Sequence, residues 1–238
     1  EYSFAHYKVG DMEKAIEGFK QLSGEKDSMG QNSMYLLGSL YLKKGDKANA
    51  RSAFQYCANN SSNETQQQIA RFNYAKLSYE LGYQDVALSE MRQFIADYPK
   101  SEYRDEANEI LLNILSHTSN FREAMEIYRG IAKPTPGMER IFADIMYGRA
   151  IELINDQQLA QADVLMADVI SNSYSNNLRP YAQFWKGEIA FRQQRYADAL
   201  RFTKAFLSAN VSGQGEANIN AARYNLGYSS LYLDLYED

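Results

Sequence analysis

A recurring pair of short helical patterns restricts the fold of this sequence more than any other feature. In the clearest copy, residues 32–58, small or apolar residues recur at three- and four-residue spacing in two runs: Met34, Leu37, Gly38 and Tyr41, then Ala50, Phe54 and Cys57. Between the runs, Gly45 suits the left-handed residue that ends a helix, and Asp46 suits the cap that begins the next one. The pattern therefore predicts a first and a second helix joined as an antiparallel hairpin.

The two helices of this hairpin are predicted to pack closely. Gly38 and Ala50 are small enough to let the helix axes approach to about 8–9 Å, and Tyr41 and Phe54 then fill the seam. A hairpin of this size cannot bury its own apolar face, so it needs a similar neighbour on each side. Stacked hairpins and an all-α fold follow from this requirement.

The same pattern returns along the whole chain at intervals of about 35–40 residues. Aligning the small residue of each first helix gives the series Ser3, Gly38, Ala75, Leu112, Gly148, Gly187 and Gly227. In the fifth copy we place the turn at Asn155, and its second helix is predicted to bury Ala160, Val164 and Ala167. Both ends of the sequence fall inside a repeat. We interpret residues 1–238 as a single solenoid fragment of about six hairpins and a truncated seventh.

These residues carry a resemblance to a known family. Gly38, Tyr41, Gly45, Ala50 and Phe54 fall at the spacing of the tetratricopeptide repeat (TPR), and the spacing recurs in the other copies. The resemblance implies an all-α, right-handed superhelical solenoid of antiparallel helix hairpins. It also implies that the first helices line a concave groove that binds a protein segment.

The resemblance further implies which side chains face that groove. They lie three positions before, one position after and four positions after the small residue of each first helix. The candidate binding residues from these rows are Tyr35, Phe72, Lys76, Tyr79, Arg149, Phe184, Phe191 and Tyr224. Aromatic side chains give a large contact area at low entropic cost, which suits peptide recognition. The alternative interpretation is that many of these rings pack between neighbouring first helices.

A groove that binds a carboxylate is not predicted, although one row has suitable residues. The best-known TPR grooves hold a C-terminal carboxylate with Lys, Asn and Arg side chains, and Lys76, Asn113 and Arg149 supply these types on consecutive first helices. The row one turn away contains Glu152, which would repel a carboxylate.

A second resemblance concerns the cellular location. The residues Phe94, Tyr98, Pro99, Ser101 and Ala107 resemble a repeat junction of bacterial envelope TPR proteins, which include outer-membrane assembly lipoproteins and periplasmic cell-division coordinators. The segment 182–188 is similar to the same group. This resemblance implies a periplasmic or outer-membrane-associated location in a bacterium, and a cytoplasmic location is the alternative.

Composition and motifs argue against several other functions. The net charge of −5 disfavours a nucleic-acid partner, and no run approaches the roughly 18 apolar residues of a membrane span. Cys57 is the one cysteine and is predicted to be a small core residue, while His6 and His117 lack metal-ligand spacing. No phosphate loop, dinucleotide fingerprint or nucleophile elbow is present. We therefore predict no catalytic residue, cofactor or metal site, and no enzymatic activity.

Three functions remain open on the sequence alone. The first is a non-catalytic scaffold that binds a protein or peptide in its concave groove. The second is a structural spacer in a larger bacterial envelope protein, and the third is a regulatory domain of an enzyme encoded elsewhere in the reading frame. The sequence leaves the oligomeric state and the identity of the partner open.

Overall fold

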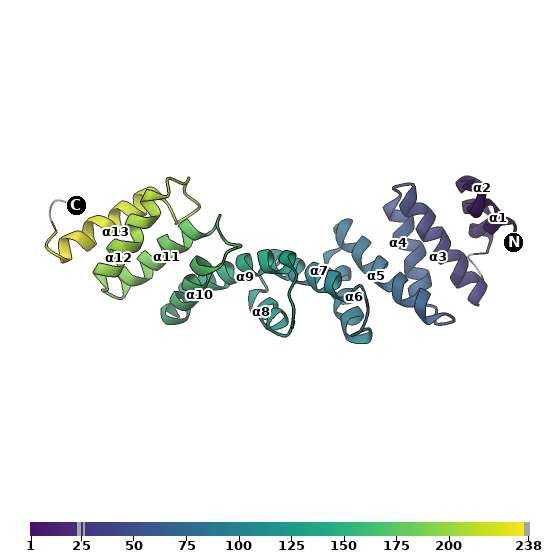
Figure 1. Cartoon of the computed structure of the whole chain (residues 1–238), viewed down its shortest axis with the longest axis horizontal. Helices are drawn as coiled ribbons and strands as arrows, with labels where there is room; N and C mark the ends of the chain where they lie inside the picture. Colours follow the sequence, from purple (N-terminus) through teal and green to yellow (C-terminus); the bar gives the residue numbers. More distant parts are fainter. Residues whose placement is uncertain (23–24, 26, 236–238) are drawn as a thin grey trace. The chain divides into compact units, whose positions relative to one another are not determined.

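The computed structural model of the chain is helical almost throughout (Figure 1). It describes residues 1–22, 25 and 27–235. Within them, thirteen helices follow one another: α1 (Tyr2–Val9), α2 (Met12–Gln21), α3 (Ser28–Lys43), α4 (Lys47–Ala58), α5 (Glu64–Glu80), α6 (Gln84–Asp97), α7 (Arg104–His117), α8 (Phe121–Arg129), α9 (Pro136–Asn155), α10 (Leu159–Ser171), α11 (Arg179–Arg192), α12 (Tyr196–Ser208) and α13 (Ile219–Tyr232). The predicted all-α fold of helix hairpins is confirmed.

The chain divides into two compact units, Glu1–Ile114 and Leu115–Asp238, with the boundary inside α7. Each unit has its own apolar core, one formed around Phe54 and Leu40 and the other around Phe206 and Ile189. From α1 to α6 in the first unit and from α8 to α13 in the second, consecutive helices pack side by side, as α3, α4 and α5 do in Figure 1. Organisation as one continuous, right-handed solenoid stays a prediction. In the described residues, no helix is both long and apolar enough to cross a bilayer.

The hairpin of α3 and α4 confirms the predicted turn and the predicted seam. Gly45 has a φ of 76°, in the left-handed region, and the Asp46 carboxylate accepts a hydrogen bond from the Asn49 backbone N–H at 3.1 Å. A Cβ atom at Gly38 would lie 2.9 Å from the ring of Phe54, so the ring occupies the space that the missing side chain leaves. Glycine at this position therefore allows the two helices to pack closely.

The same local geometry closes six consecutive hairpins. A left-handed residue ends each first helix, and an alanine five residues later is fully buried in the second helix. The left-handed residues are Gly10, Gly45, Gly82, Ser119, Gln157 and Gln194, and the alanines are Ala15, Ala50, Ala87, Ala124, Ala162 and Ala199. The turn therefore fixes which face of the second helix enters the core.

The predicted register of the fifth repeat is wrong by two residues. Its left-handed residue is Gln157, with a φ of 59°, because α9 continues to Asn155. The second helix consequently buries Ala162, Met166 and Val169 instead of Ala160, Val164 and Ala167. The same shift makes Ala150, which is fully buried, the small residue of α9, whereas Gly148 gives room to Phe121 of α8.

A glycine at either left-handed glutamine is expected to stabilise the protein. Gln157 and Gln194 both have a φ of 59°, which is strained for a residue with a Cβ atom. Glycine also adds conformational entropy to the unfolded chain, which offsets part of this gain. Gln157→Gly should therefore raise the free energy of unfolding by about 0.5–1 kcal/mol. Urea unfolding measures the change. The control Ala167→Gly, at an exposed site inside α10, should lower it by about 1 kcal/mol. A loss of stability in both variants would contradict the left-handed turn.

Candidate protein-binding face

Five of the first helices, α1, α3, α5, α11 and α13, carry two rows of side chains that are exposed or half-exposed. They lie one and four positions after the small residue, and we call them the first-helix face. In the first unit they are Phe4 and Tyr7, Ser39 and Leu42, and Lys76 and Tyr79; in the second they are Glu188 and Phe191 on α11, and Tyr228 and Leu231 on α13. These rows offer surface to a partner, as the TPR resemblance implied.

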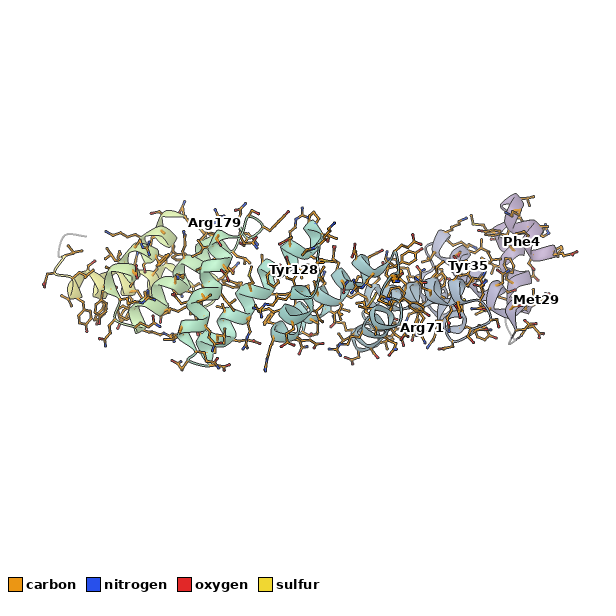
Figure 2. The ribbon with its side chains drawn as sticks, turned by 60° about the horizontal axis from the view of Figure 1, so that its bottom comes forward. Phe4, Met29, Tyr35, Arg71, Tyr128 and Arg179 are labelled. Carbon is orange, nitrogen blue, oxygen red and sulfur yellow. The ribbon has the colours of Figure 1, made fainter. Side chains whose placement is uncertain are left out.

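Tyr35 lies on α3, three positions before the small residue Gly38 (Figure 2). Its ring is half-buried and meets Phe54 edge-on, with ring centroids 6.2 Å apart. Burial raises the pKa of the Tyr35 hydroxyl, so this group stays protonated and neutral across the physiological range. Nearby, the Lys43 ammonium lies 5.4 Å from the centre of the Tyr7 ring. Tyr35 therefore combines a core contact with an accessible polar edge.

Lys76 and Tyr79 lie on the α5 part of the face. The Lys76 ammonium forms an ion pair with Glu106 of α7 at 2.6 Å, and its side chain is about one-third exposed. This ion pair neutralises the charge that a carboxylate clamp would need. Tyr79 is half-exposed on the same side of α5. Lys76 and Tyr79 are thus partly accessible, and any partner would compete with Glu106 for the Lys76 ammonium.

Phe72 and Phe184 are not accessible, which corrects two of the candidate residues. Phe72 is 2% exposed and stacks on Tyr103, with ring centroids 4.8 Å apart. Phe184 is 3% exposed and packs edge-on against Trp185 and Phe206 at centroid distances of 5.2 and 5.3 Å. For these two rings the alternative interpretation, packing between helices, holds.

Arg149 is also displaced from the first-helix face, because the register of α9 differs from the predicted one. It precedes the small residue Ala150 by one position, where other first helices place the buried Leu37 and Tyr74. Its guanidinium pairs with Glu152 on the same helix at 2.8 Å. Together with residues of α8 it lines a cavity away from the first-helix face. Arg149 therefore does not occupy the row position that the sequence pattern assigned to it on α9.

Helices α11, α12 and α13 together present an aromatic surface, made of Phe191, Tyr196, Tyr224, Tyr228 and Tyr232. The rings of Tyr196 and Tyr232 stack at 4.3 Å, Tyr224 and Tyr228 approach to 4.5 Å, and Phe191 meets Tyr224 edge-on at 6.4 Å. Tyr224 is 57% exposed and Tyr228 42%. These two rings line a shallow pocket of about 290 Å³ together with Gly227 and Leu231.

Part of this surface was missed by reasoning from the repeat rows. Tyr196 begins the second helix α12, and Tyr232 ends α13, so neither occupies a row position. The concentration of tyrosines in residues 224–236 is the sequence signal that could have indicated an aromatic surface. The hydroxyl of Tyr224 has a raised pKa because of its hydrogen bond to Tyr228, so the Tyr224 hydroxyl stays protonated at physiological pH.

The described residues show no group of His, Cys, Asp and Glu side chains arranged to hold a metal ion. His6 lies 3.2 Å from the Asp11 carboxylate at the first turn. Cys57 is fully buried and packs in the core of the first unit. The contacts of His6 and Cys57 therefore belong to the packing of the fold.

Cys57 is expected to be unreactive in the native protein. Burial raises the pKa of its thiol to about 12, so very little thiolate exists at pH 8. Labelling by a chromogenic disulfide reagent at pH 8 should be at least about 100-fold slower in buffer than in concentrated urea. Equal rates would show that the thiol is accessible and its helix is misplaced.

Comparisons with known proteins bear on the family. A family model described as a tetratricopeptide repeat-like domain matches residues 4–141, and one described as a tetratricopeptide repeat matches residues 147–214. Similar solved structures include a tetratricopeptide repeat protein from Parabacteroides merdae, with 16% identity, 95% of each chain covered and a TM-score of 0.48. A second is the TPR domain of P58(IPK), with 16% identity, 100% of this chain and 65% of that chain covered, and a TM-score of 0.41. A third is pilF of Pseudomonas aeruginosa, with 14% identity, 92% of this chain and 94% of that chain covered, and a TM-score of 0.43. No curated protein matches the chain. Because the first family model covers more than half of the sequence, the chain belongs to the tetratricopeptide repeat-like family.

Proposed function

We propose that this chain is a non-catalytic scaffold that binds a protein segment through its first-helix face, with the aromatic surface of α11 and α13 as the main contact. TPR domains generally mediate contacts between proteins, and proteins of this family are typically non-catalytic. The observation that carries the proposal is the contiguous aromatic surface, in which Tyr224 and Tyr228 are 57% and 42% exposed and flank a shallow pocket. Monomeric proteins rarely expose several neighbouring aromatic rings without a binding role.

The proposed contact is an extended or helical peptide with apolar side chains. Tyrosine offers both a flat apolar face and a hydroxyl, so it binds such segments with little loss of side-chain entropy. Glu188 lies beside Phe191 on the same face and accepts hydrogen bonds from Arg192 and Asn225. Within the first unit, Tyr35, Tyr79 and Lys76 are the proposed contact residues, whereas the buried Phe72 and Phe184 are left out of the proposal.

Replacing Tyr224 and Tyr228 with alanine is expected to weaken peptide binding at least about tenfold, because aromatic anchors dominate interface energies. Peptides selected from a random display library on the wild-type chain serve as probes, and fluorescence anisotropy gives their affinities. The control Tyr2→Ala/Tyr174→Ala removes two other exposed rings and should change affinity less than twofold. Unchanged affinity in the Tyr224→Ala/Tyr228→Ala variant would remove the aromatic surface from the proposal.

A spacer role is the second candidate, and two observations favour it. Phe72 and Phe184 fill space between helices, and Lys76 and Arg149 are engaged in ion pairs with Glu106 and Glu152. If the chain is only a spacer, the folded wild-type protein should select no peptide from the library. Library selection therefore distinguishes the scaffold from the spacer.

A location in the bacterial envelope is part of the proposal and rests on the sequence resemblance of the junction that follows α6. Phe94 and Ala107 are fully buried there, and the ring of Tyr98 lies 5.3 Å from that of Phe94. These contacts account for the residues of the junction but apply to any compartment. Fractionation of the source cells with an antibody against the chain tests the location, and recovery in the cytosolic fraction would contradict it.

A further inference from the structure

Two rings hold α8 on α9, and an arginine follows each of them. Phe121 packs against α9 at Gly148, and Tyr128 (Figure 2) stacks on an aromatic ring of α9 with centroids 3.7 Å apart. The next residues in the sequence are Arg122 and Arg129. Because seven residues are nearly two helical turns, these arginines lie on one face of α8, about 10 Å apart along the axis. Both are exposed, and neither forms an ion pair within the described part of the chain.

A cavity of about 370 Å³ lies between α8, α9 and α10, and these two arginines line it together with Arg149. We call it the arginine groove. Among its described lining residues, Glu126 is the one carboxylate. The acidic side chains Glu152 and Asp156 line a neighbouring cavity toward the end of α9. Three guanidinium groups thus gather on one side of a chain whose net charge is −5.

The opposite wall of the groove is apolar where other repeats are polar. Val164 lies seven residues after the left-handed turn residue of its repeat and is 61% exposed. The residues at the same position of the other hairpins are Glu17, Ser52, Ser89, Glu126 and Arg201. Beside Val164 lie Leu165, half-buried, and the buried Met125. An exposed valine in an otherwise polar row, opposite unpaired arginines, is a feature that the core does not require.

We propose that the arginine groove binds an acidic segment of a partner protein, separately from the first-helix face. Two carboxylates would pair with Arg122 and Arg129, since guanidinium groups recognise carboxylates through paired hydrogen bonds. In a segment with the polyproline II conformation, which has three residues per turn and a rise of about 3.1 Å, side chains three residues apart lie on the same face about 9 Å from each other, close to the separation of the two arginines. An apolar side chain between the carboxylates then lies on Val164 and Leu165. Nucleic acid fits less well, because Glu126 and the neighbouring carboxylates repel a phosphate at every nucleotide.

The test uses the full chain and a fluorescein-labelled peptide, Gly-Glu-Leu-Ser-Glu-Gly, with the Gln-for-Glu peptide as its neutral counterpart. Anisotropy in 50 mM salt should show binding of the acidic peptide, weakened at least about tenfold by Arg122→Glu/Arg129→Glu and by the neutral counterpart. The matched control Lys133→Glu/Arg140→Glu makes the same change of charge at exposed sites outside the groove and should alter affinity less than twofold. Val164→Ser should weaken binding about threefold through the lost apolar contact.

Three outcomes would overturn the proposal. The first is equal loss of affinity in the two charge-reversed variants, which would indicate general electrostatic attraction. The second is equal binding of the acidic and the neutral peptide, or no binding of either at millimolar concentration. The third is tighter binding of a single-stranded oligonucleotide that competes with the peptide. Thermal unfolding of each variant, followed by circular dichroism, shows that the fold is intact. None of these variants changes the aromatic surface, so this proposal and the proposed function fail separately.

Discussion

Replacement of Gly38 by leucine is expected to lower the free energy of unfolding by about 3 kcal/mol, because it overfills a closed seam. A Cβ atom at this position would lie 2.9 Å from two ring atoms of Phe54. Phe54 is 1% exposed and is held by the edge of Tyr35, so the ring has little room to move aside. The loss should appear although leucine forms helix better than glycine does.

Gly227 provides a matched control for this change. It occupies the same position of the last first helix, but a Cβ atom there would meet nothing within 4 Å. Gly227→Leu should therefore keep the helix-propensity gain, up to about 1 kcal/mol, without the clash. Urea unfolding followed by circular dichroism compares the two variants, and Gly38→Ala serves if the leucine variant does not fold. Equal stability of the Gly38→Leu and Gly227→Leu variants would contradict the close packing of α3 and α4.

The turns explain how much of the fold could be predicted from the sequence. Gly10, Gly45 and Gly82 are glycines with positive φ, and each marks the end of a first helix correctly. Ser119 is left-handed as well, although serine rarely adopts this conformation. At Gln157 the residue type gave no signal, and the nearby Asn155 is a better candidate for a left-handed residue. The register of the fifth repeat was therefore wrong, although its two helices were correctly expected.

The candidate site was harder to predict, because accessibility depends on what the neighbouring elements place over a ring. Phe72 shares its row with Tyr224, yet Tyr103 covers Phe72, whereas Tyr224 stays 57% exposed beside Tyr228. Arg149 was assigned to the first-helix face through the register error, and its true position faces α8. The arginine groove combines side chains from three helices and has no motif in the sequence. Its nearest sequence signal is Val164, an apolar residue in a polar row.

Phe206→Ala is expected to lower the stability of the second unit by about 3–5 kcal/mol, because it leaves a cavity in the core. The Phe206 side chain is 1% exposed and packs against Phe184 and Tyr181. Trp185, the one tryptophan of the chain, contacts the same Phe184 ring, so its fluorescence reports the unfolding of this unit. In urea titrations, the midpoint of the fluorescence change should move to a lower urea concentration, by the shift that a loss of about 3–5 kcal/mol produces.

The equivalent change in the first unit, Phe54→Ala, tests whether the chain behaves as one solenoid. Phe54 is 1% exposed, so its loss should cost the first unit a similar 3–5 kcal/mol, seen by circular dichroism. In a repeat array each hairpin is stabilised by its neighbours, so a weakened first unit also weakens the second. We expect the Trp185 midpoint to fall in this variant as well, by a smaller amount than in Phe206→Ala. An unchanged Trp185 midpoint would mean that the two units unfold independently, and the chain would then be two solenoid domains instead of one.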